Sequence, residues 1–223
     1  CIATITWWLV GYGFAFGEDF NKIIGVSHFA GNGFDNSNHY RDWLFQWAFV
    51  GTASTIVSGS LAERTKLISY SIYSFLISTI IYPVIVHWTW GGGWLSELGY
   101  IDFAGSGIVH MLGGMAGGTG AYFVGPRLNR YNNEMKYNFI PHNVPFVVLG
   151  TFLLWFGWYG FNGGSTFGIV GYGELAAKTM VTTTISAGCG ALATLALGSF
   201  IDSKYEGKSV IKLQYANNGV LAG

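Results

Sequence analysis

One histidine, His110, lies in an apolar stretch, from Phe103 to Gly125, that contains no Asp, Glu, Lys or Arg. A stretch of this length and composition is typical of a membrane-spanning helix, where an ionisable residue marks a functional site by default. An imidazole can accept and donate a proton near neutral pH, because its unperturbed pKa is about 6.5. His110 is therefore predicted to handle protons inside a membrane, with a hydrogen bond to a neighbouring helix as the structural alternative.

A second set of side chains is expected near His110. Phe49, Trp90, Phe161 and Ser165 lie in or next to predicted spans, at the same end as His110. For each ring taken singly, packing in the core or against lipid is the alternative, and Trp90 could also belong to an interfacial belt. Together with His110 they predict an aromatic cluster above a buried imidazole.

Composition indicates an integral membrane protein. Hydrophobic residues make up 51% of the chain and charged residues only 10%, and most of the 34 glycines fall inside apolar runs. The formal net charge is zero and no block of like charge is present, which disfavours nucleic-acid binding. The two cysteines, Cys1 and Cys189, are too few for a disulfide scaffold, and Cys189 is predicted to be a buried free thiol.

Runs with little or no charge predict an all-α polytopic membrane protein. Complete spans are expected at 43–62, 67–86, 103–125, 143–163 and 179–201, with partial spans at 1–16 and 214–223. Both terminal runs are too short to cross a bilayer. The chain is therefore interpreted as a piece of a longer protein.

The distribution of basic residues predicts the orientation of these helices. Segments 63–66, 126–142 and 202–212 hold eight of the eleven Lys and Arg residues, and segments 17–42, 87–102 and 164–178 hold the other three. The two sets alternate along the chain, so the first is predicted to be cytoplasmic and the second external. His110 then lies about 10 Å below the outer boundary, at a rise of about 1.5 Å per residue.

Small residues surround His110. The spacings Gly113 with Gly117 and Gly114 with Gly118 allow helix backbones to approach closely, so this helix is expected to be enclosed by other helices. Asp102 precedes the helix and is expected to cap its free backbone N–H groups. The remaining histidines, His87 among them, are predicted in loops or at helix boundaries, in solvated or capping roles.

Several motifs in order resemble the ammonium transporter family, Amt, within the wider group that includes the Rhesus proteins. They are FQWAFVGTASTIVSGSLAERTKL (45–67), HWTWGGGW (87–94), DFAGSGIVHMLGG (102–114), GTFLLWFGWYGFNGGS (150–165) and the terminal NNGVLAG. The resemblance covers nearly the whole chain. It implies a homotrimer of subunits with eleven transmembrane helices each, of which this chain is similar to helix 2 through the start of helix 8.

The resemblance also implies roles for individual residues. Phe49 and Phe161 correspond to a stacked pair that gates the pore, and His110 to the first of two pore histidines, the second of which lies beyond Gly223. Trp90 and Ser165, with Phe49, correspond to an external ammonium site. Gln46 corresponds to a glutamine near the gate, Tyr82 to an aromatic at the pore wall, and Asp102 to a structural support.

The implied activity is ammonium transport, with methylammonium as an analogue and no cofactor or metal ion. Carrying the charge through hydrocarbon is costly, so deprotonation before passage of ammonia lowers the barrier. Whether the proton also crosses is left open. The alternatives are a Rhesus-like channel for ammonia or carbon dioxide, which needs the cation site less, and a sensor that retains the site. An enzyme is not expected, because the sequence has no nucleophile–base constellation and no metal-ligand spacing.

Overall fold

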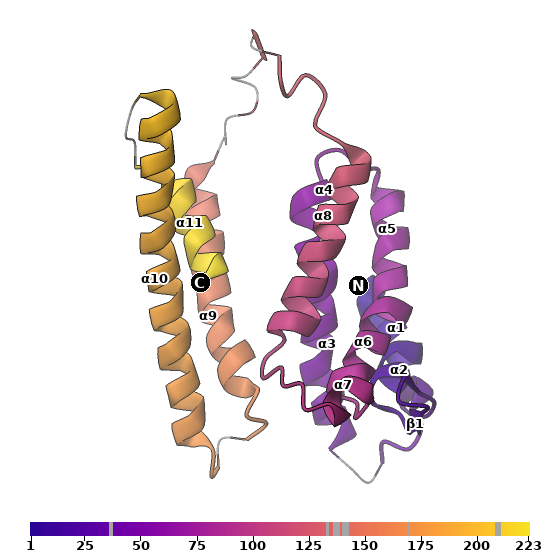
Figure 1. The fold of residues 1–223 in the computed structure, drawn as a ribbon. Coiled ribbons are helices and arrows are strands. Elements are labelled where there is room, and N and C mark those ends of the chain that lie inside the picture. The colour runs from indigo at the N-terminus through magenta and orange to yellow at the C-terminus, as the bar shows by residue number, and fades with distance from the viewer. Residues whose placement is uncertain (36–37, 133, 136–138, 140–142, 169, 208–210) are drawn as a thin grey trace. The chain divides into compact units, whose positions relative to one another are not determined.

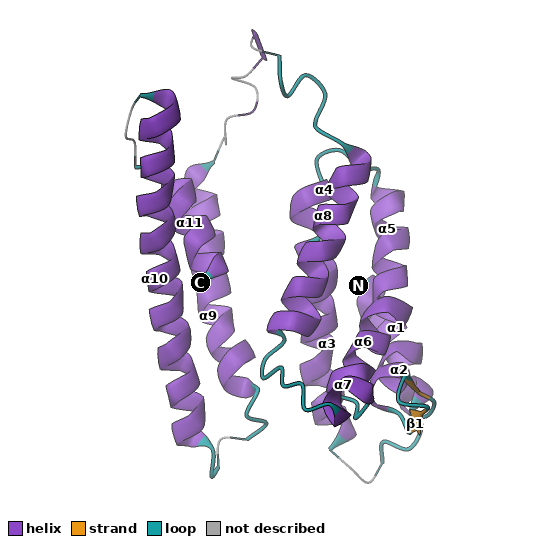
Figure 2. Ribbon diagram, viewed as in Figure 1, coloured by secondary structure: helices purple, strands orange, loops and turns teal. Residues whose placement is uncertain are grey.

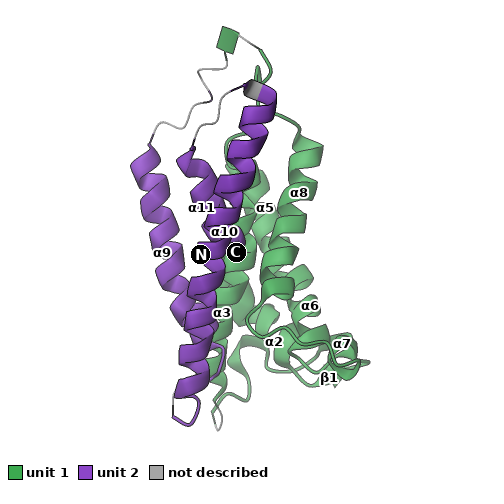
Figure 3. Ribbon diagram, turned by 60° about the vertical axis from the view of Figure 1, so that its left-hand side comes forward, with its two compact units in different colours: residues 1–135 green, residues 136–223 purple. Residues whose placement is uncertain are grey.

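The fold is almost entirely helical, with one two-stranded hairpin (Figures 1 and 2). The computed structural model describes residues 1–35, 38–132, 134–135, 139, 143–168, 170–207 and 211–223. It divides into two compact units, residues 1–135 and residues 136–223 (Figure 3). The two units are described separately.

Unit 1 contains the first four apolar runs, the last of which ends at Gly125. Its helices are α1 Ile2–Thr6, η1 Trp7–Gly11, α2 Tyr12–Phe16, η2 Phe29–Gly31, α3 His39–Ile56, α4 Ser58–Leu61, α5 Leu67–Leu76, η3 Ile77–Ile81, α6 Tyr82–Thr89, α7 Trp94–Glu97, η4 Ser106–Met111 and α8 Leu112–Val124. Strands β1 Asp19–Phe20 and β2 Ile24–Gly25 pair antiparallel. Three of the helical segments, η1, η3 and η4, are π-helical turns that continue directly into α-helix.

The core of unit 1 combines large rings with polar contacts between helices. Trp7 and Tyr82 are fully buried, with ring centroids 5.9 Å apart. The hydroxyls of Thr6 and Ser78 are hydrogen-bonded at 2.7 Å, which joins α1 to η3. This bond gives each hydroxyl a protein partner in an environment where no water could serve as one.

Small residues bring α8 close to α3 and α4. A Cβ atom added at Gly113 would lie 2.9 Å from Cβ of Ile56, and one at Gly117 would lie 2.8 Å from Oγ of Ser60. The close packing expected for this pair is therefore confirmed. At Gly114 and Gly118 an added Cβ would meet nothing within 4 Å among the described residues, so the second pair makes no such contact there.

The described residues of unit 2 form the helices α9 Val144–Gly164, α10 Gly173–Glu206 and α11 Leu213–Ala222. Its internal contacts are partly polar: the Thr194 hydroxyl donates to the Tyr215 carbonyl at 2.7 Å, and Lys212 forms an ion pair with Asp202 at 2.8 Å. Helix α10 begins six residues before the predicted span at 179 and continues past 201. Charged residues mark the edge of the membrane but do not stop a helix, because Glu and Lys are good helix formers.

Three helices in the described part of the chain are long and apolar enough to cross a membrane, namely Leu67–Glu97, Val144–Gly164 and Gly173–Tyr205. The predicted spans 43–62 and 103–125 fall on α3–α4 and on η4–α8. Many large apolar side chains are exposed, including Leu67 at 79% and Phe123 at 80%. Hydrocarbon, not water, is the solvent that such surfaces require.

Two expectations need adjustment. Cys189 is a free thiol as expected, but it is exposed on α10 and not buried. Parts of the predicted loops 126–142 and 202–212 lie outside the described residues.

Candidate functional site

The carboxylate of Asp102 holds the start of η4. Its Oδ1 accepts from the backbone N–H groups of Gly105 at 2.7 Å and Ser106 at 3.0 Å, and its Oδ2 accepts from Gly107 and Ile108, both at 2.9 Å. The first turn of a helix leaves N–H groups without intrahelical partners, and it favours negative charge. The predicted capping role of Asp102 is therefore confirmed, with both oxygens used.

Trp90 is fixed by the same residue. The indole N–H donates to the backbone carbonyl of Asp102 at 2.6 Å, and the ring meets Phe49 edge-on, with centroids 5.5 Å apart and an interplanar angle of 85°. Trp90 is half-buried, whereas Phe49 is 1% exposed. Asp102 thus orients an aromatic face through its main chain and a helix start through its side chain.

The backbone between Asp102 and η4 requires a glycine. Gly105 has φ of +93°, a conformation that residues with a Cβ rarely adopt. An added Cβ would lie 2.7 Å from the side chain of Val109 and 3.5 Å from the Phe49 ring. Gly105 therefore allows the loop to turn sharply into the helix next to Phe49.

His110 lies in η4, one residue before its end. Its backbone N–H and that of Val109 both donate to the Gly105 carbonyl, at 3.0 and 2.9 Å, which is the widened pattern of a π-turn. Such turns are frequent at functional sites, because they rotate a side chain out of the regular helical register. The His110 side chain lies at the surface of unit 1.

Gln46 and Tyr82 are both buried, at 4% and 0% exposed. Gln46 lies one turn before Phe49 on α3, and its Oε1 has no hydrogen-bond partner among the described residues. The Tyr82 hydroxyl likewise has none there. Gln46 thus offers an acceptor oxygen one turn from the Phe49 ring, while Tyr82 serves the core through its contact with Trp7.

Phe161 and Ser165 belong to unit 2. Ser165 is 8% exposed and follows α9, and its hydroxyl donates to the Phe161 carbonyl at 2.8 Å. Because the hydroxyl proton is used in that bond, the lone pairs of Oγ are left to accept from another donor. Oγ can therefore accept a hydrogen bond from a ligand whose polar groups are all N–H donors.

The structure thus brings together Phe49, Trp90 and Asp102 in unit 1, with Gly105 next to Phe49. Gly105 was not predicted as a site residue, and the sequence signal for it was its place between a capping residue and a helix start. That Phe161 and Ser165 lie next to Phe49 and Trp90 stays a prediction. No group of three or more His, Cys, Asp or Glu side chains that could hold a metal ion is found in the described ranges.

The predicted role of His87 is wrong. It was expected to be solvated or capping, but it lies inside α6 with 0% exposure. Its Nδ1 bonds the Ala15 carbonyl at 3.0 Å, and its Nε2 bonds Oδ1 of Asp19 at 2.8 Å. The sequence could not show this burial, because the contacts come from residues about seventy positions away.

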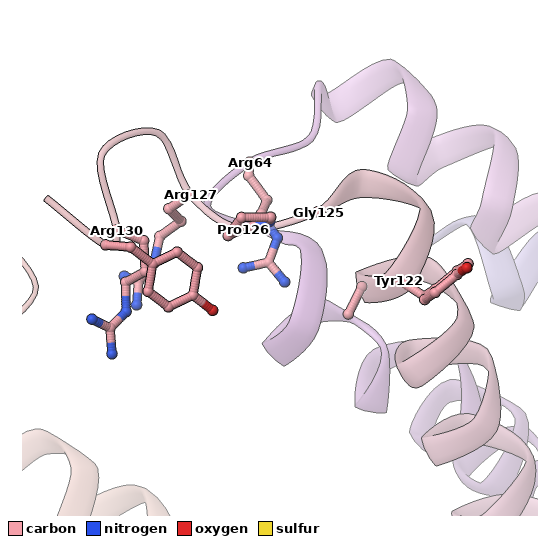
Figure 4. A pocket seen from close by; sticks show the side chains of 8 residues that line it. Arg64, Tyr122, Gly125, Pro126, Arg127 and Arg130 are labelled. Atoms are coloured by element: carbon pink, nitrogen blue, oxygen red, sulfur yellow. The ribbon is translucent and has the colours of Figure 1, made fainter.

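A separate cavity of about 410 Å³ lies at the far end of α8 from Asp102. Arg64, Arg127 and Arg130 line it (Figure 4), and Arg127 forms an ion pair with Glu63 at 2.6 Å. The cavity is basic, whereas the aromatic site faces the other end of the same helix. It therefore has no part in cation binding.

Long apolar helices with exposed apolar side chains define a polytopic membrane protein, and its described part holds a capped π-turn with a histidine and a fixed aromatic pair. The chain belongs to the ammonium transporter family: the model of the Ammonium Transporter Family matches residues 1–223. This result agrees with the resemblance in the sequence motifs.

Curated relatives support the assignment. The chain is 46% identical to Ammonium transporter 1 member 1 of Solanum lycopersicum, over 87% of this chain and 44% of that protein. It is 40% identical to Ammonium transporter Amt2 of Archaeoglobus fulgidus, over 88% of this chain and 44% of that protein. The chain therefore spans about half the length of the curated relatives it matches.

Solved structures show the same fold. A protein described as Sensor Amt Protein superposes with a TM-score of 0.86 at 36% identity, over 99% of this chain and 55% of that one. Mep2 of Saccharomyces cerevisiae superposes with a TM-score of 0.82 at 28% identity, over 99% of this chain and 49% of that one. The helices described here thus form part of a larger helical fold of the ammonium transporter type.

We predict that Asp102→Ala destabilises the protein more than Asp102→Asn. Alanine leaves four backbone N–H groups without their acceptor, whereas asparagine keeps one acceptor oxygen. An unsatisfied buried donor costs about 1–3 kcal/mol. Thermal unfolding of the purified full-length protein in detergent measures the difference, and unchanged stability in both variants would show that the carboxylate does not stabilise the helix start.

Proposed function

We propose that the complete protein transports ammonium across a membrane. The observation that carries the proposal is the fixed pair of Trp90 and Phe49, held by the Asp102 carbonyl next to the start of a helix that carries His110. A compact cation is attracted to the face of an aromatic ring. The family of the chain and the names of its relatives support the same activity.

Ser165 is proposed as a further residue that binds ammonium. Its hydroxyl already donates to the Phe161 carbonyl, so Oγ can accept an N–H of ammonium. Phe49 and Phe161 are proposed to close the pore beneath the site, with Gln46 offering a further acceptor. Polar and aromatic groups would thus bind the cation, and Phe49 and Phe161 would exclude water from the pore.

His110 is proposed as a proton relay. Moving ammonium intact into hydrocarbon is costly, so loss of its proton near the site lets neutral ammonia continue between apolar walls. A neutral imidazole can accept a proton at one nitrogen and donate one from the other. Asp102 and Tyr82 are proposed to support the site without contacting the cation.

The assembly around the chain is proposed as a homotrimer in the lipid bilayer of the cell or plasma membrane. We propose no enzymatic activity, since the arrangement of groups supports binding and proton transfer. A Rhesus-like neutral channel and a sensor remain the alternatives; Trp90 and Ser165 favour the transporter over the channel, because they provide a cation site.

We predict that the full-length protein restores growth on ammonium in cells lacking their own uptake. His110→Ala is expected to reduce uptake about a hundredfold, the lower end of what is lost with a general acid–base group. Trp90→Leu is expected to raise the half-saturating concentration about fivefold, since about 1 kcal/mol of cation–π attraction is lost. Uptake of labelled methylammonium, normalised to protein at the cell surface, measures both.

Exposed Glu97 provides the control, and Glu97→Gln should transport like wild type. Wild-type protein that reaches the surface without uptake or current would contradict the transport proposal and favour a sensor. Full activity in His110→Ala would instead leave transport intact and remove the histidine from the relay.

The loops 63–66, 126–142 and 202–212 are proposed to be cytoplasmic, on the basis of their Lys and Arg content. A cysteine introduced at Asn129, in a variant lacking Cys1 and Cys189, should react with an impermeant maleimide only after the membrane is permeabilised. Reaction in intact cells would reverse the orientation and place the Trp90 site inside.

A further inference from the structure

His87 is the most deeply enclosed ionisable side chain near Trp90. It lies on α6 three residues before Trp90, with 0% exposure, and both ring nitrogens are hydrogen-bonded. The Ala15 carbonyl can only accept, so Nδ1 donates to it, and Nε2 forms the second hydrogen bond with the Asp19 carboxyl. The buried ring thus has a partner on each nitrogen.

This pair joins three separate segments. Ala15 lies in α2 and Asp19 in β1, and the distances of 3.0 and 2.8 Å fasten both to α6. Lys22 extends the network, 3.5 Å from Asp19 and 3.1 Å from Glu97. The hydrogen bond from His87 lowers the pKa of the Asp19 carboxyl, and nearby Lys22 lowers it further.

The chain around Trp90 folds back onto the same histidine. The Gly93 N–H donates to the His87 carbonyl at 2.8 Å, which closes the turn that follows Trp90. A Cβ at Gly91 would lie 2.7 Å from Nδ1 of His87 and would collide with the Ala15 carbonyl. Trp90 is therefore held at its indole N–H by Asp102 and at its backbone by the surroundings of His87.

We propose that the His87–Asp19 hydrogen bond positions Trp90 for ammonium binding, so that His87 and Asp19 are positioning residues that act without touching the cation. The inference rests on the proposed function and deepens it. If this bond were lost, the buried ring would lack its second partner, and α6 would lose its side-chain hydrogen bond to the hairpin. The indole face would then sample several orientations.

The test compares Asp19→Ala, Asp19→Asn and Glu97→Gln in the full-length protein. Alanine removes the partner of Nε2, whereas the asparagine amide can donate to a neutral Nε2 and keep the tie. Glu97 is the matched control, because its side chain is 58% exposed and contacts the same Lys22 without touching His87. Methylammonium uptake is measured against concentration and normalised to surface protein.

Asp19→Ala is expected to raise the half-saturating concentration about fivefold with little change in maximal rate, the factor expected when part of a cation–π contact is lost. Asp19→Asn and Glu97→Gln should stay close to wild type. A purely structural role would instead lower the amount of folded protein without moving the half-saturating concentration. That outcome would overturn the proposal.

A second readout does not depend on transport. The indole N–H resonance of Trp90 can be assigned in ¹⁵N-tryptophan-labelled protein by its absence in Trp90→Phe. It should broaden or exchange faster with water in Asp19→Ala, and remain as in wild type in Glu97→Gln. An unchanged resonance in Asp19→Ala overturns the positioning role, while a wild type that does not transport overturns only the proposed function.

Discussion

The described site depends on the backbone N–H groups that a membrane helix leaves unpaired at its start. In hydrocarbon no water can satisfy them, and each would cost several kcal/mol if left alone. The Asp102 carboxylate accepts four of them, from Gly105 to Ile108, and its carbonyl accepts the Trp90 indole. Asp102 therefore satisfies the N–H groups at the helix terminus and also sets the orientation of the Trp90 ring.

The Asp102 cap also determines how the chain enters η4. Gly105 adopts φ of +93° so that the chain can enter η4 next to Phe49, and the first turns of η4 are π-helical. A π-turn changes the direction in which the following side chains point, and His110 belongs to that turn. The cap, the turn and the histidine thus form one continuous piece of structure.

The sequence predicted the parts of this arrangement that depend on local chemistry. Asp102 before an apolar run indicated a cap, and Gly113 with Gly117 indicated a close helix contact; both are confirmed. The boundaries of α10 were less predictable, since charged residues end a membrane span without ending a helix. The π-turns were not predicted, because no residue pattern distinguishes them from α-helix.

Contacts between distant segments also lay beyond the sequence. His87 looked like a boundary residue, yet Ala15 and Asp19 enclose it from another part of the chain. The Asp19 carboxyl gives the fully buried imidazole its second hydrogen-bond partner, which burial would otherwise leave unsatisfied. The hairpin formed by β1 and β2 is therefore part of the site's support, in addition to the helices.

The most direct test of the account is a cryo-electron microscopy structure of the full-length protein with bound methylammonium. We expect density for the cation over the indole face of Trp90, with the Ser165 hydroxyl within hydrogen-bond distance and the Asp102 carboxylate still on the η4 N–H groups. A cation bound away from Trp90, or coordinated directly by the Asp102 carboxylate, would contradict the account.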